Sequence, residues 1–457
     1  MSVADEVVEV TAEPMLASTR PIKVSVIVPV YNGNRTLHRC LSAITASDYP
    51  DYELIVVDDC STDDTVQIAK EYSARILSLE GGPYGPGYAR NRGVEVASGD
   101  VVFFVDADVV VPPSTVTKVA KTFMDEPGIS AMFGSYDDAP QAGAFSSQFK
   151  NLFHHFVHQQ GSEQAVTFWS GCGAVRRDVF LEFGGFDSDR YPRPSIEDIE
   201  LGYRLTAAGH RIKMNKSIQV KHLKNWTIRG MLKADIFDRA IPWTQLILRE
   251  RDLPNELNLG LSQRASALLL CVLVVHLCFT AYFHNILVLL PLVGIFFVAV
   301  GYWNWSEDVA PLSKISPRAE KFMYALTIAT GGLALYSGRP LLLIPIGLLI
   351  IGMVAGRRFG QFNRMVRSFL FLALIIGALS AFAILVMNFS VWLLTPLLGI
   401  IATIVVLNLK FYVFFIRKRG VMFALAAIPF HLLYFLYSIV TFALVTGVHA
   451  WNTSVKK

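Results

Sequence analysis

Two carboxylates, Asp106 and Asp108, end the stretch GDVVFFVDAD at residues 99–108. Residues 101–105 form an apolar run with the length of one buried strand. Because alternate side chains of a strand point the same way, both carboxylates are expected to reach one point just beyond its end. A hard divalent cation, Mg or Mn, binds well at such a point and bridges carboxylates to substrate phosphates. The sequence therefore predicts a metal–phosphate site.

The same spacing recurs at Asp187 and Asp189, but no strand precedes that pair, and we interpret it as an ordinary turn. A second group of acids, Glu197 and Asp198, begins a predicted helix at residues 196–208. A positioned carboxylate can remove the proton of a sugar hydroxyl as that hydroxyl attacks. The alternative is a negatively charged first turn that complements the helix dipole, which accounts well for Glu200.

The elements around these acids alternate between strand and helix. Apolar, β-branched runs predict strands at residues 24–30, 53–57, 75–79 and 101–105, with short helical segments between them. This order indicates an α/β domain with a mostly parallel sheet. Ligands of such sheets bind at the carboxyl ends of the strands. Tyr31, Asp58 and Asp106 all fall at predicted strand ends, which favours one shared site.

With these motifs the chain resembles the family 2 glycosyltransferases. The matching stretches are VSVIVPVYNG (24–33), VVDDCSTDDT (56–65), GPGYARNRGVEVASGD (85–100), VDAD (105–108), GGFD (184–187) and IEDIELGYRL (196–205). The resemblance covers roughly residues 22–250 and implies the GT-A fold, a Rossmann-like α/β domain that binds a nucleotide-sugar donor. It implies Asp198 as the catalytic base, with Glu197 beside it.

The resemblance also implies how the donor is held. The residues implied in donor binding are Pro29, Tyr31, Asp58, Arg90 and Asp106. Asp58 would contact the base, and Arg90 would lie near the base or the diphosphate. Asp106 and Asp108 would face the ribose and the metal–diphosphate. Some relatives use a histidine near His222 as a third metal ligand, although a surface or core histidine is an equal alternative.

Two further motifs bear on function. His154, His155 and His158 share a predicted helix at residues 144–160, where a polar helix face is a simpler interpretation than a zinc site. The processive polysaccharide synthases of the family carry Q-x-x-R-W, whereas this chain has DRAIPW at residues 238–243. This departure favours transfer of one sugar over polymer synthesis.

The composition indicates a membrane protein. Hydrophobic residues make up 53% and charged residues 17% of the 457 residues, with a net charge of +4. The excess of apolar residues lies beyond residue 264, and we expect about seven spans. They are predicted at 265–284, 286–303, 322–337, 340–356, 368–388, 391–415 and 421–447. Basic clusters follow the second, fourth and sixth spans, which suits a membrane protein better than a nucleic-acid binder and predicts a cytoplasmic catalytic domain.

These signals divide the chain into a disordered tail (1–21), a GT-A domain (22–227), amphipathic interface helices with a linker (228–263), an all-α transmembrane domain (264–448) and a C-terminal tail (449–457). In the interface segment Pro242 is expected to separate two helices. Residues 1–20 lack the basic start and apolar core of a signal peptide. The five cysteines form no C-x-x-C pair and are expected to be reduced thiols facing a cytoplasm.

The sequence thus predicts a multi-pass enzyme of the plasma (inner) membrane that takes part in building the cell envelope. It would be an inverting glycosyltransferase that moves one sugar from a nucleotide sugar to a lipid-linked acceptor, either a polyprenyl phosphate or a glycolipid. The alternatives are a processive polysaccharide synthase, or a glycolipid flippase or channel that carries a nucleotide-sugar-binding domain. No nucleic-acid partner is expected.

Overall fold

The computed structural model describes residues 21–250, 260–284 and 391–455. Contacts within the chain divide it into two compact units. The first unit consists of residues up to 135 together with 162–221, and the second of residues 136–161 together with 222–457. A segment of 26 residues in the middle of the catalytic sequence therefore belongs with the C-terminal helices. The sequence-based domain bounds, 22–227 and 264–448, stay predictions.

The first unit is built on a nine-stranded sheet in the order β3-β2-β1-β4-β8-β6-β9-β5, with β7 beside β9. The strands are β1 Val24–Val30, β2 Tyr52–Asp58, β3 Arg75–Ser78, β4 Val101–Val105, β5 Val109–Val110, β6 Ile129–Tyr136, β7 Gln164–Ala165, β8 Cys172–Arg176 and β9 Arg211–His222. β1 lies parallel to both β2 and β4, and β2 parallel to β3. β8 runs antiparallel to β4 and β6. The carboxyl ends of β1, β2 and β4 therefore meet at one edge.

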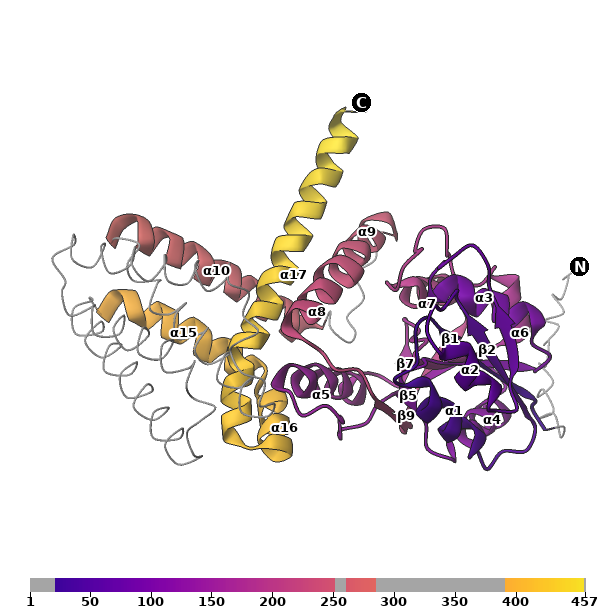
Figure 1. Ribbon diagram of the computed structural model, residues 1–457. Coiled ribbons are helices and arrows are strands. Elements are labelled where there is room, and N and C mark those ends of the chain that lie inside the picture. Colours follow the sequence, from indigo (N-terminus) through magenta and orange to yellow (C-terminus); the bar gives the residue numbers. More distant parts are fainter. Residues whose placement is uncertain (1–20, 251–259, 285–390, 456–457) are drawn as a thin grey trace, which may run out of the picture. The chain divides into compact units, whose positions relative to one another are not determined.

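Helices connect these strands and cover the sheet (Figure 1). They are α1 Leu37–Thr45, α2 Thr65–Lys70, α3 Pro86–Val96, α4 Thr115–Asp125, α6 Arg177–Glu182 and α7 Glu197–Ala207. Every residue of β1 and β4 is buried, as expected for central strands covered on both faces. The predicted α/β class is confirmed, and the four strands predicted from the sequence agree with β1–β4 to within one residue.

The second unit is helical in the described residues. It contains α5 Phe145–Gln160, α8 Ile228–Lys233, the π-helix η1 Ala234–Ala240, α9 Ile241–Glu250, α10 Leu261–His284, α15 Val391–Leu407, α16 Leu409–Arg419 and α17 Val421–Val455. Although α5 lies between β6 and β7 in the sequence, its phenylalanines pack against aromatic residues of α16 and α17. Phe149, for example, lies 5.8 Å from Phe415 and 5.5 Å from Phe430 between ring centroids.

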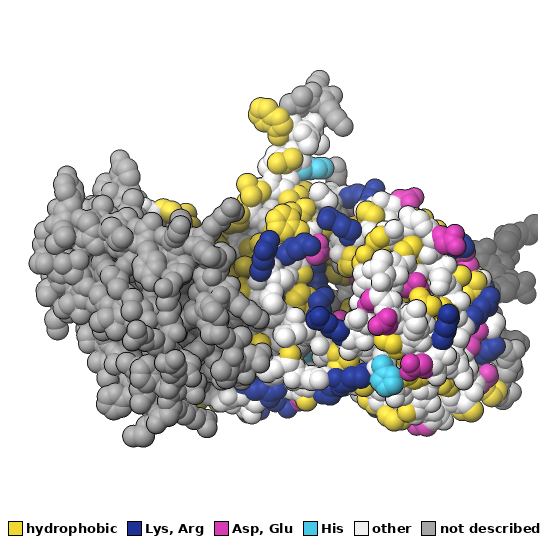
Figure 2. Space-filling model, in the orientation of Figure 1, with side chains coloured by type: hydrophobic (Ala, Val, Ile, Leu, Met, Phe, Trp, Pro, Cys, Tyr) yellow, Lys and Arg dark blue, Asp and Glu magenta, His cyan; other side chains and the backbone are white. Residues whose placement is uncertain are grey.

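Two of the predicted spans correspond to helices long and apolar enough to cross a membrane, Leu261–Cys278 and Val421–Ser454. Exposed hydrophobic side chains run along α17, as Figure 2 shows in yellow. The predictions at 286–303, 322–337, 340–356 and 368–388 lie outside the described residues.

The segment predicted as a span at 391–415 consists of two helices, α15 and α16, which are bent by 73° and together are long and apolar enough for a broken span or a re-entrant loop. At the break the Asn408 side chain donates to the Ile404 carbonyl (2.8 Å) and to Ser266 Oγ of α10 (2.8 Å), so it competes with the helical backbone bonds. In the interface segment Pro242 does not separate two helices. It is the second residue of α9, where a proline needs no donor, and η1 precedes it.

Candidate active site

The loops after β1 and β2 are joined by hydrogen bonds at the edge of the sheet. The Asn32 amide donates to Ser61 Oγ (2.8 Å), and the Thr62 amide donates to Asn32 Oδ1 (2.8 Å). Asn32 and Cys60 both have positive φ values, 52° and 64°, a region that non-glycine residues seldom adopt. Such backbone conformations are frequent at ligand sites. Tyr31, at the end of β1, is 50% exposed and open to a ligand.

The predicted donor residues Pro29 and Asp58 lie on neighbouring strands. Pro29 is buried in β1 and pairs with Val57, and Asp58 is the last residue of β2. Asp58 is 4% exposed, and its Oδ1 accepts from the Ser61 amide (3.2 Å). Asp59, which the sequence analysis did not single out, accepts from the amides of Tyr84 (2.9 Å) and Gly85 (2.7 Å). These hydrogen bonds hold the loop that leads into α3 next to the end of β2.

Arg90 on α3 forms the centre of the site. Its guanidinium donates to Asp106 Oδ1 (2.6 Å) and to Glu197 Oε1 (3.0 Å), and the side chain is 4% exposed. Burial disfavours the charge on Arg90, but the neighbouring carboxylates outweigh burial and raise its pKa. Arg90 thus joins Asp106, which follows β4, to Glu197, the first residue of α7. Phe186 packs on the guanidinium, 5.6 Å from its ring centroid.

Asp198, the predicted base, is fixed by the segment before β8. Its Oδ2 accepts from both the amide and the hydroxyl of Ser170, each at 2.9 Å, and its Oδ1 accepts from the Ile199 amide at 2.8 Å. Neighbouring Gly171 accepts from the Asp106 amide (3.2 Å). One short segment therefore holds both the candidate base and the first aspartate of the D-x-D motif.

Glu197, next to the base, is turned into the protein. It is 4% exposed, and its Oε2 accepts from the Ser195 amide (3.0 Å). Burial, followed by the charge of Asp198, raises the pKa of Glu197 to about 7, although Arg90 acts in the opposite direction. Glu200 has a structural role, because Arg204 pairs with it (2.9 Å) and donates to the carbonyl of Gly185 (2.6 Å).

The second aspartate of the motif, Asp108, is half-buried, and Asp106 keeps 32% of its side-chain surface exposed. Among the described residues no group of three or more His, Cys, Asp or Glu side chains is placed to hold a metal. Two carboxylates nevertheless fit Mg or Mn, which proteins commonly bind through one or two carboxylates and the substrate phosphates. Arg90 engages Asp106 through Oδ1, and Oδ2 lies on the other side of that carboxylate.

His222, predicted as a third metal ligand, belongs to the second unit. Its ring stacks on Tyr136 at 4.2 Å and 8°, and its Nδ1 lies 2.7 Å from Asn151 Oδ1. A metal role for His222 stays a prediction. His154 and His158 also belong to the second unit, with ring centroids 4.2 Å apart, and His155 bonds to the Tyr136 carbonyl (2.7 Å).

Three features of this region differ from the sequence-based interpretation or extend it. The small residues of SGCG (170–173) suggest a loop that a sugar could approach closely, but Cys172 and Gly173 belong to β8. A Cβ at Gly173 would lie 2.2 Å from the Trp169 carbonyl, so this glycine permits backbone packing. Asn91 was missed as well, and it exchanges two hydrogen bonds with the backbone of Phe186 (2.8 and 2.9 Å). The predicted turn at Asp187 and Asp189 is present, and Asp187 caps it.

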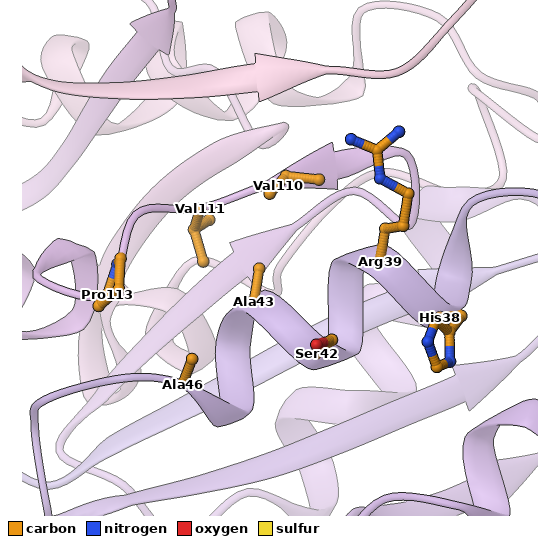
Figure 3. Close-up of a pocket in the computed structure, with 8 residues that line it drawn as sticks. All are labelled: His38, Arg39, Ser42, Ala43, Ala46, Val110, Val111 and Pro113. Carbon is orange, nitrogen blue, oxygen red and sulfur yellow. The ribbon is translucent and has the colours of Figure 1, made fainter.

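An open groove of about 410 Å³ lies elsewhere on the first unit. It is lined by α1 and the segment around β5, mostly by apolar side chains (Figure 3). None of the predicted site residues lines it, so the candidate site rests on the strand ends rather than on this groove.

Comparison with known proteins identifies the family of the segment that contains these strand ends. The model of glycosyl transferase family 2 matches residues 25–184, which include β1, Asp58, Arg90 and the D-x-D motif. This matched segment belongs to glycosyl transferase family 2. The glycosyltransferase domain has the predicted GT-A fold, and apolar helices follow it.

Known relatives cover parts of the glycosyltransferase chain. The poly(ribitol-phosphate) beta-N-acetylglucosaminyltransferase TarS of Staphylococcus aureus is 40% identical over 111 residues, which are 23% of this chain and 19% of TarS. The glycosyltransferase AglE of Haloferax volcanii is 29% identical over 204 residues, which are 43% of this chain and 65% of AglE. The chain therefore spans less than two thirds of the length of these relatives. A solved mannosyltransferase of Pyrobaculum calidifontis, in complex with GDP-Man and Mn2+, is 20% identical with a TM-score of 0.42 and covers 74% of this chain and 88% of its own.

Proposed function

We propose that this chain is a membrane-bound inverting glycosyltransferase that moves one sugar from a nucleotide-sugar donor to a lipid-linked acceptor. The observation that carries the proposal is the linked set of Asp106, Arg90 and Glu197, with Asp198 fixed beside it by Ser170. All of these side chains belong to the first unit. Arg90 and Asp106 lie within the segment that matches the family, and Glu197 and Asp198 follow it.

The donor side of the reaction would lie at the ends of β1, β2 and β4. Tyr31 and Asp58 would receive the nucleoside, and Asp106 and Asp108 would face the diphosphate. Mg or Mn bound there would neutralise the charge of the leaving group. The two carboxylates would hold that ion, and Arg90 would keep Asp106 in place while the donor binds.

On the acceptor side, Asp198 would take the proton of the attacking hydroxyl. The oxygen then forms a bond to the anomeric carbon while the bond from that carbon to the donor phosphate breaks on the opposite face, which inverts the configuration. The hydrogen bonds from Ser170 and Ile199 fix the carboxylate for this transfer. If the acceptor is a polyprenyl phosphate, its phosphate oxygen is already ionised and needs no base.

Two observations support a lipid-linked acceptor and an inward-facing domain. The apolar helices α10 and α17 would place the chain in a membrane. Arg419 donates to Gln148 (2.7 Å), and Lys418 pairs with Asp138, so the basic end of α16 contacts the segment of residues 136–161. That segment runs between strands β6 and β7 of the catalytic sheet, so this basic cluster would lie on the catalytic side of the membrane. By the positive-inside rule this side is the cytoplasm of an inner-membrane protein.

Nucleotide release by purified, detergent-solubilised protein tests the proposal. The assay would supply a panel of nucleotide sugars, a membrane lipid extract and Mg or Mn, with and without a chelator. We expect metal-dependent release from one donor, loss of release in Asp108→Asn, and normal release in the control Asp189→Asn, an exposed turn residue. Release in Asp108→Asn equal to that of the control would refute the assignment of the D-x-D motif.

Mass spectrometry of the lipid products would complete the test. Addition of one sugar supports the proposal, whereas a ladder of products would mean processive synthesis. Movement of labelled glycolipid between the leaflets of proteoliposomes, without transfer, would support the flippase alternative instead.

A further inference from the structure

The helix α5 has two faces of opposite character. Phe145, Phe149 and Phe153 pack into the aromatic cluster of α16 and α17. The opposite face, which we call the polar face of α5, consists of Lys150, Asn151, His154 and His158. At helical spacing these four residues lie on one side. A polar face of this kind is unusual on a helix that packs against membrane-spanning segments.

Positive charge dominates around the polar face. Lys150 is buried and pairs with Asp235 of η1, the one acid in direct contact with it. Burial lowers the pKa of the Lys150 ammonium, and the nearby cations Arg239 and Lys224 lower it further, although Asp235 acts in the opposite direction. The Lys224 ammonium lies 4.2 Å from the ring centroid of Trp226. Lys150 thus lies beside one buried carboxylate, Asp235, and near two exposed cations, Arg239 and Lys224.

The histidines continue the polar face away from Lys150. His154 lies 4.8 Å from Tyr136 and 4.2 Å from His158 between ring centroids. Burial, then the neighbouring His158 and Arg239, holds the pKa of His154 well below its usual range, so its ring is neutral and carries both a donor and an acceptor. Asp235 is engaged by Lys150 and by the Tyr437 hydroxyl (2.6 Å), whereas Arg239 and Lys224 are exposed and can meet a ligand.

The buried Asn151 carries a polar atom that has no hydrogen-bond partner among the described residues. Asn151 is 2% exposed, and its Nδ2 makes no hydrogen bond, while its Oδ1 is engaged by His222. Buried polar atoms are nearly always paired, and an exception points to a bound water or ligand. A buried donor next to excess positive charge selects an anion.

We propose that the polar face of α5, together with Lys224 and Arg239, binds a phosphate group carried by a membrane lipid. Phosphate oxygens accept hydrogen bonds from amide, imidazole, ammonium and guanidinium donors, and these are the groups present. A lipid-borne phosphate is favoured because α5 packs on the membrane-spanning α17. Lys and Arg side chains also gather over the region of α8 and α9 (Figure 2). The proposal rests on the proposed function in one respect, since this lipid would be the carrier of the acceptor.

Direct binding tests this site without turnover. Full-length protein in phosphatidylcholine nanodiscs would be titrated with radiolabelled farnesyl phosphate, in the presence of a chelator and without a sugar donor. Farnesol, inorganic phosphate and pyrophosphate would serve as competitors. The variants are Arg239→Gln and, as a matched control, Lys233→Gln at the exposed end of α8. His154→Gln is a further variant that keeps a polar side chain on the helix.

We expect farnesyl phosphate to bind at least about tenfold more tightly than farnesol, which corresponds to about 1.4 kcal/mol. Arg239→Gln and His154→Gln should each weaken binding about tenfold, and Lys233→Gln should change it less than about twofold. Equal binding of the phosphate and the alcohol, or equal effects of Arg239→Gln and Lys233→Gln, would overturn the proposal. Competition by inorganic phosphate or pyrophosphate at the same concentration as farnesyl phosphate would overturn the assignment to a lipid.

The outcome is independent of the transfer assay. A chain that transfers no sugar would still bind farnesyl phosphate if the polar face of α5 is a phosphate site. Conversely, metal-dependent release of nucleotide with no preference for farnesyl phosphate would keep the proposed function and remove this inference alone.

Discussion

Each unit of the chain has a cluster of charged side chains around a buried ion pair, and the charges near the two pairs differ in sign. In the first unit one cation, Arg90, lies between Asp106 and Glu197. In the second unit one acid, Asp235, pairs with Lys150. Buried charges are costly unless they are paired, so an excess of either sign is retained where a ligand of the opposite sign compensates for it.

This difference suits the two sides of one reaction. The acidic cluster would accept a metal ion and, through it, the diphosphate of the donor. The basic cluster would accept a phosphate directly. The two buried ion pairs also differ in what they connect. Arg90 links elements that meet at one edge of the sheet, whereas Lys150 links α5 to η1. The predictions below test each cluster, starting with the largest expected effect.

The largest effect is expected for Arg90→Met. Without the guanidinium, two carboxylates would face one another with no cation between them. We expect the free energy of unfolding to fall by about 3–5 kcal/mol, and the rate of transfer to fall by about 1,000-fold or more because the carboxylates would be displaced. Thermal denaturation and the nucleotide-release assay measure these two quantities.

The matched control for Arg90→Met is Arg92→Met on the same helix. Arg92 is exposed and pairs with Glu95 three residues later. An exposed pair of this kind contributes about 0–1 kcal/mol. If both variants were equally stable and active, Arg90 would not be the link between donor and acceptor sides.

The next effect is expected for Asp198→Asn. The amide keeps the size of the side chain but cannot take a proton, so transfer to a hydroxyl acceptor should slow about 100-fold or more. Because both oxygens of Asp198 accept from backbone amides and the amide nitrogen cannot, the variant should also lose about 1–3 kcal/mol of stability. The measurement is a single-turnover rate at saturating donor. A mild loss, similar to that of Ser170→Ala, would instead mean that an ionised phosphate oxygen is the nucleophile.

In the second unit, Lys150→Met should lower the free energy of unfolding by about 3 kcal/mol, because Asp235 would remain buried without its cation. The control is Lys418→Met, since Lys418 pairs with Asp138 at a half-exposed position. That variant should cost less than about 1 kcal/mol. Thermal denaturation in detergent compares the stability of the two variants. Equal losses would mean that the buried Lys150–Asp235 pair contributes no more to stability than the half-exposed pair.

Much of the first unit could be predicted from the sequence. The strands β1, β2 and β4 consist of apolar runs that end on a turn signal or on acids, so both their extent and the edge at which their polar residues meet follow from local patterns. The role of Ser170 was not predictable in the same way. Its contact with Asp198 joins residues 28 positions apart and depends on how β8 enters the sheet.

The second unit was harder to predict for the same reason. Helix α5 was expected near residues 144–160, and it spans Phe145–Gln160, but its aromatic packing partners on α16 and α17 lie more than 250 residues later in the chain. Its pattern of phenylalanines does not specify which surface covers them. The break at Asn408 depends on Ser266 and Gln263 of a distant helix, and a continuous apolar run gave no signal of it.

The smallest effect concerns pH and the buried carboxyl of Glu197. Burial and the charge of Asp198 raise the pKa of Glu197 to about 7 from an ordinary 4.5. Between these two pH values the carboxyl of Glu197 is protonated in the native state and ionised in the unfolded chain. Stability from this group is therefore fully present below pH 4.5 and is lost as the pH rises through 7, by up to about 3 kcal/mol.

The variant Glu197→Gln tests this pH dependence, because it keeps an acceptor for Arg90 but cannot titrate. Its unfolding free energy should change less steeply than that of the wild type between pH 4.5 and 7, with Glu95→Gln, an exposed acid, as the control. Parallel curves for the wild type and Glu197→Gln would mean that Glu197 is ionised throughout this range, and that Arg90 fully compensates for both carboxylates.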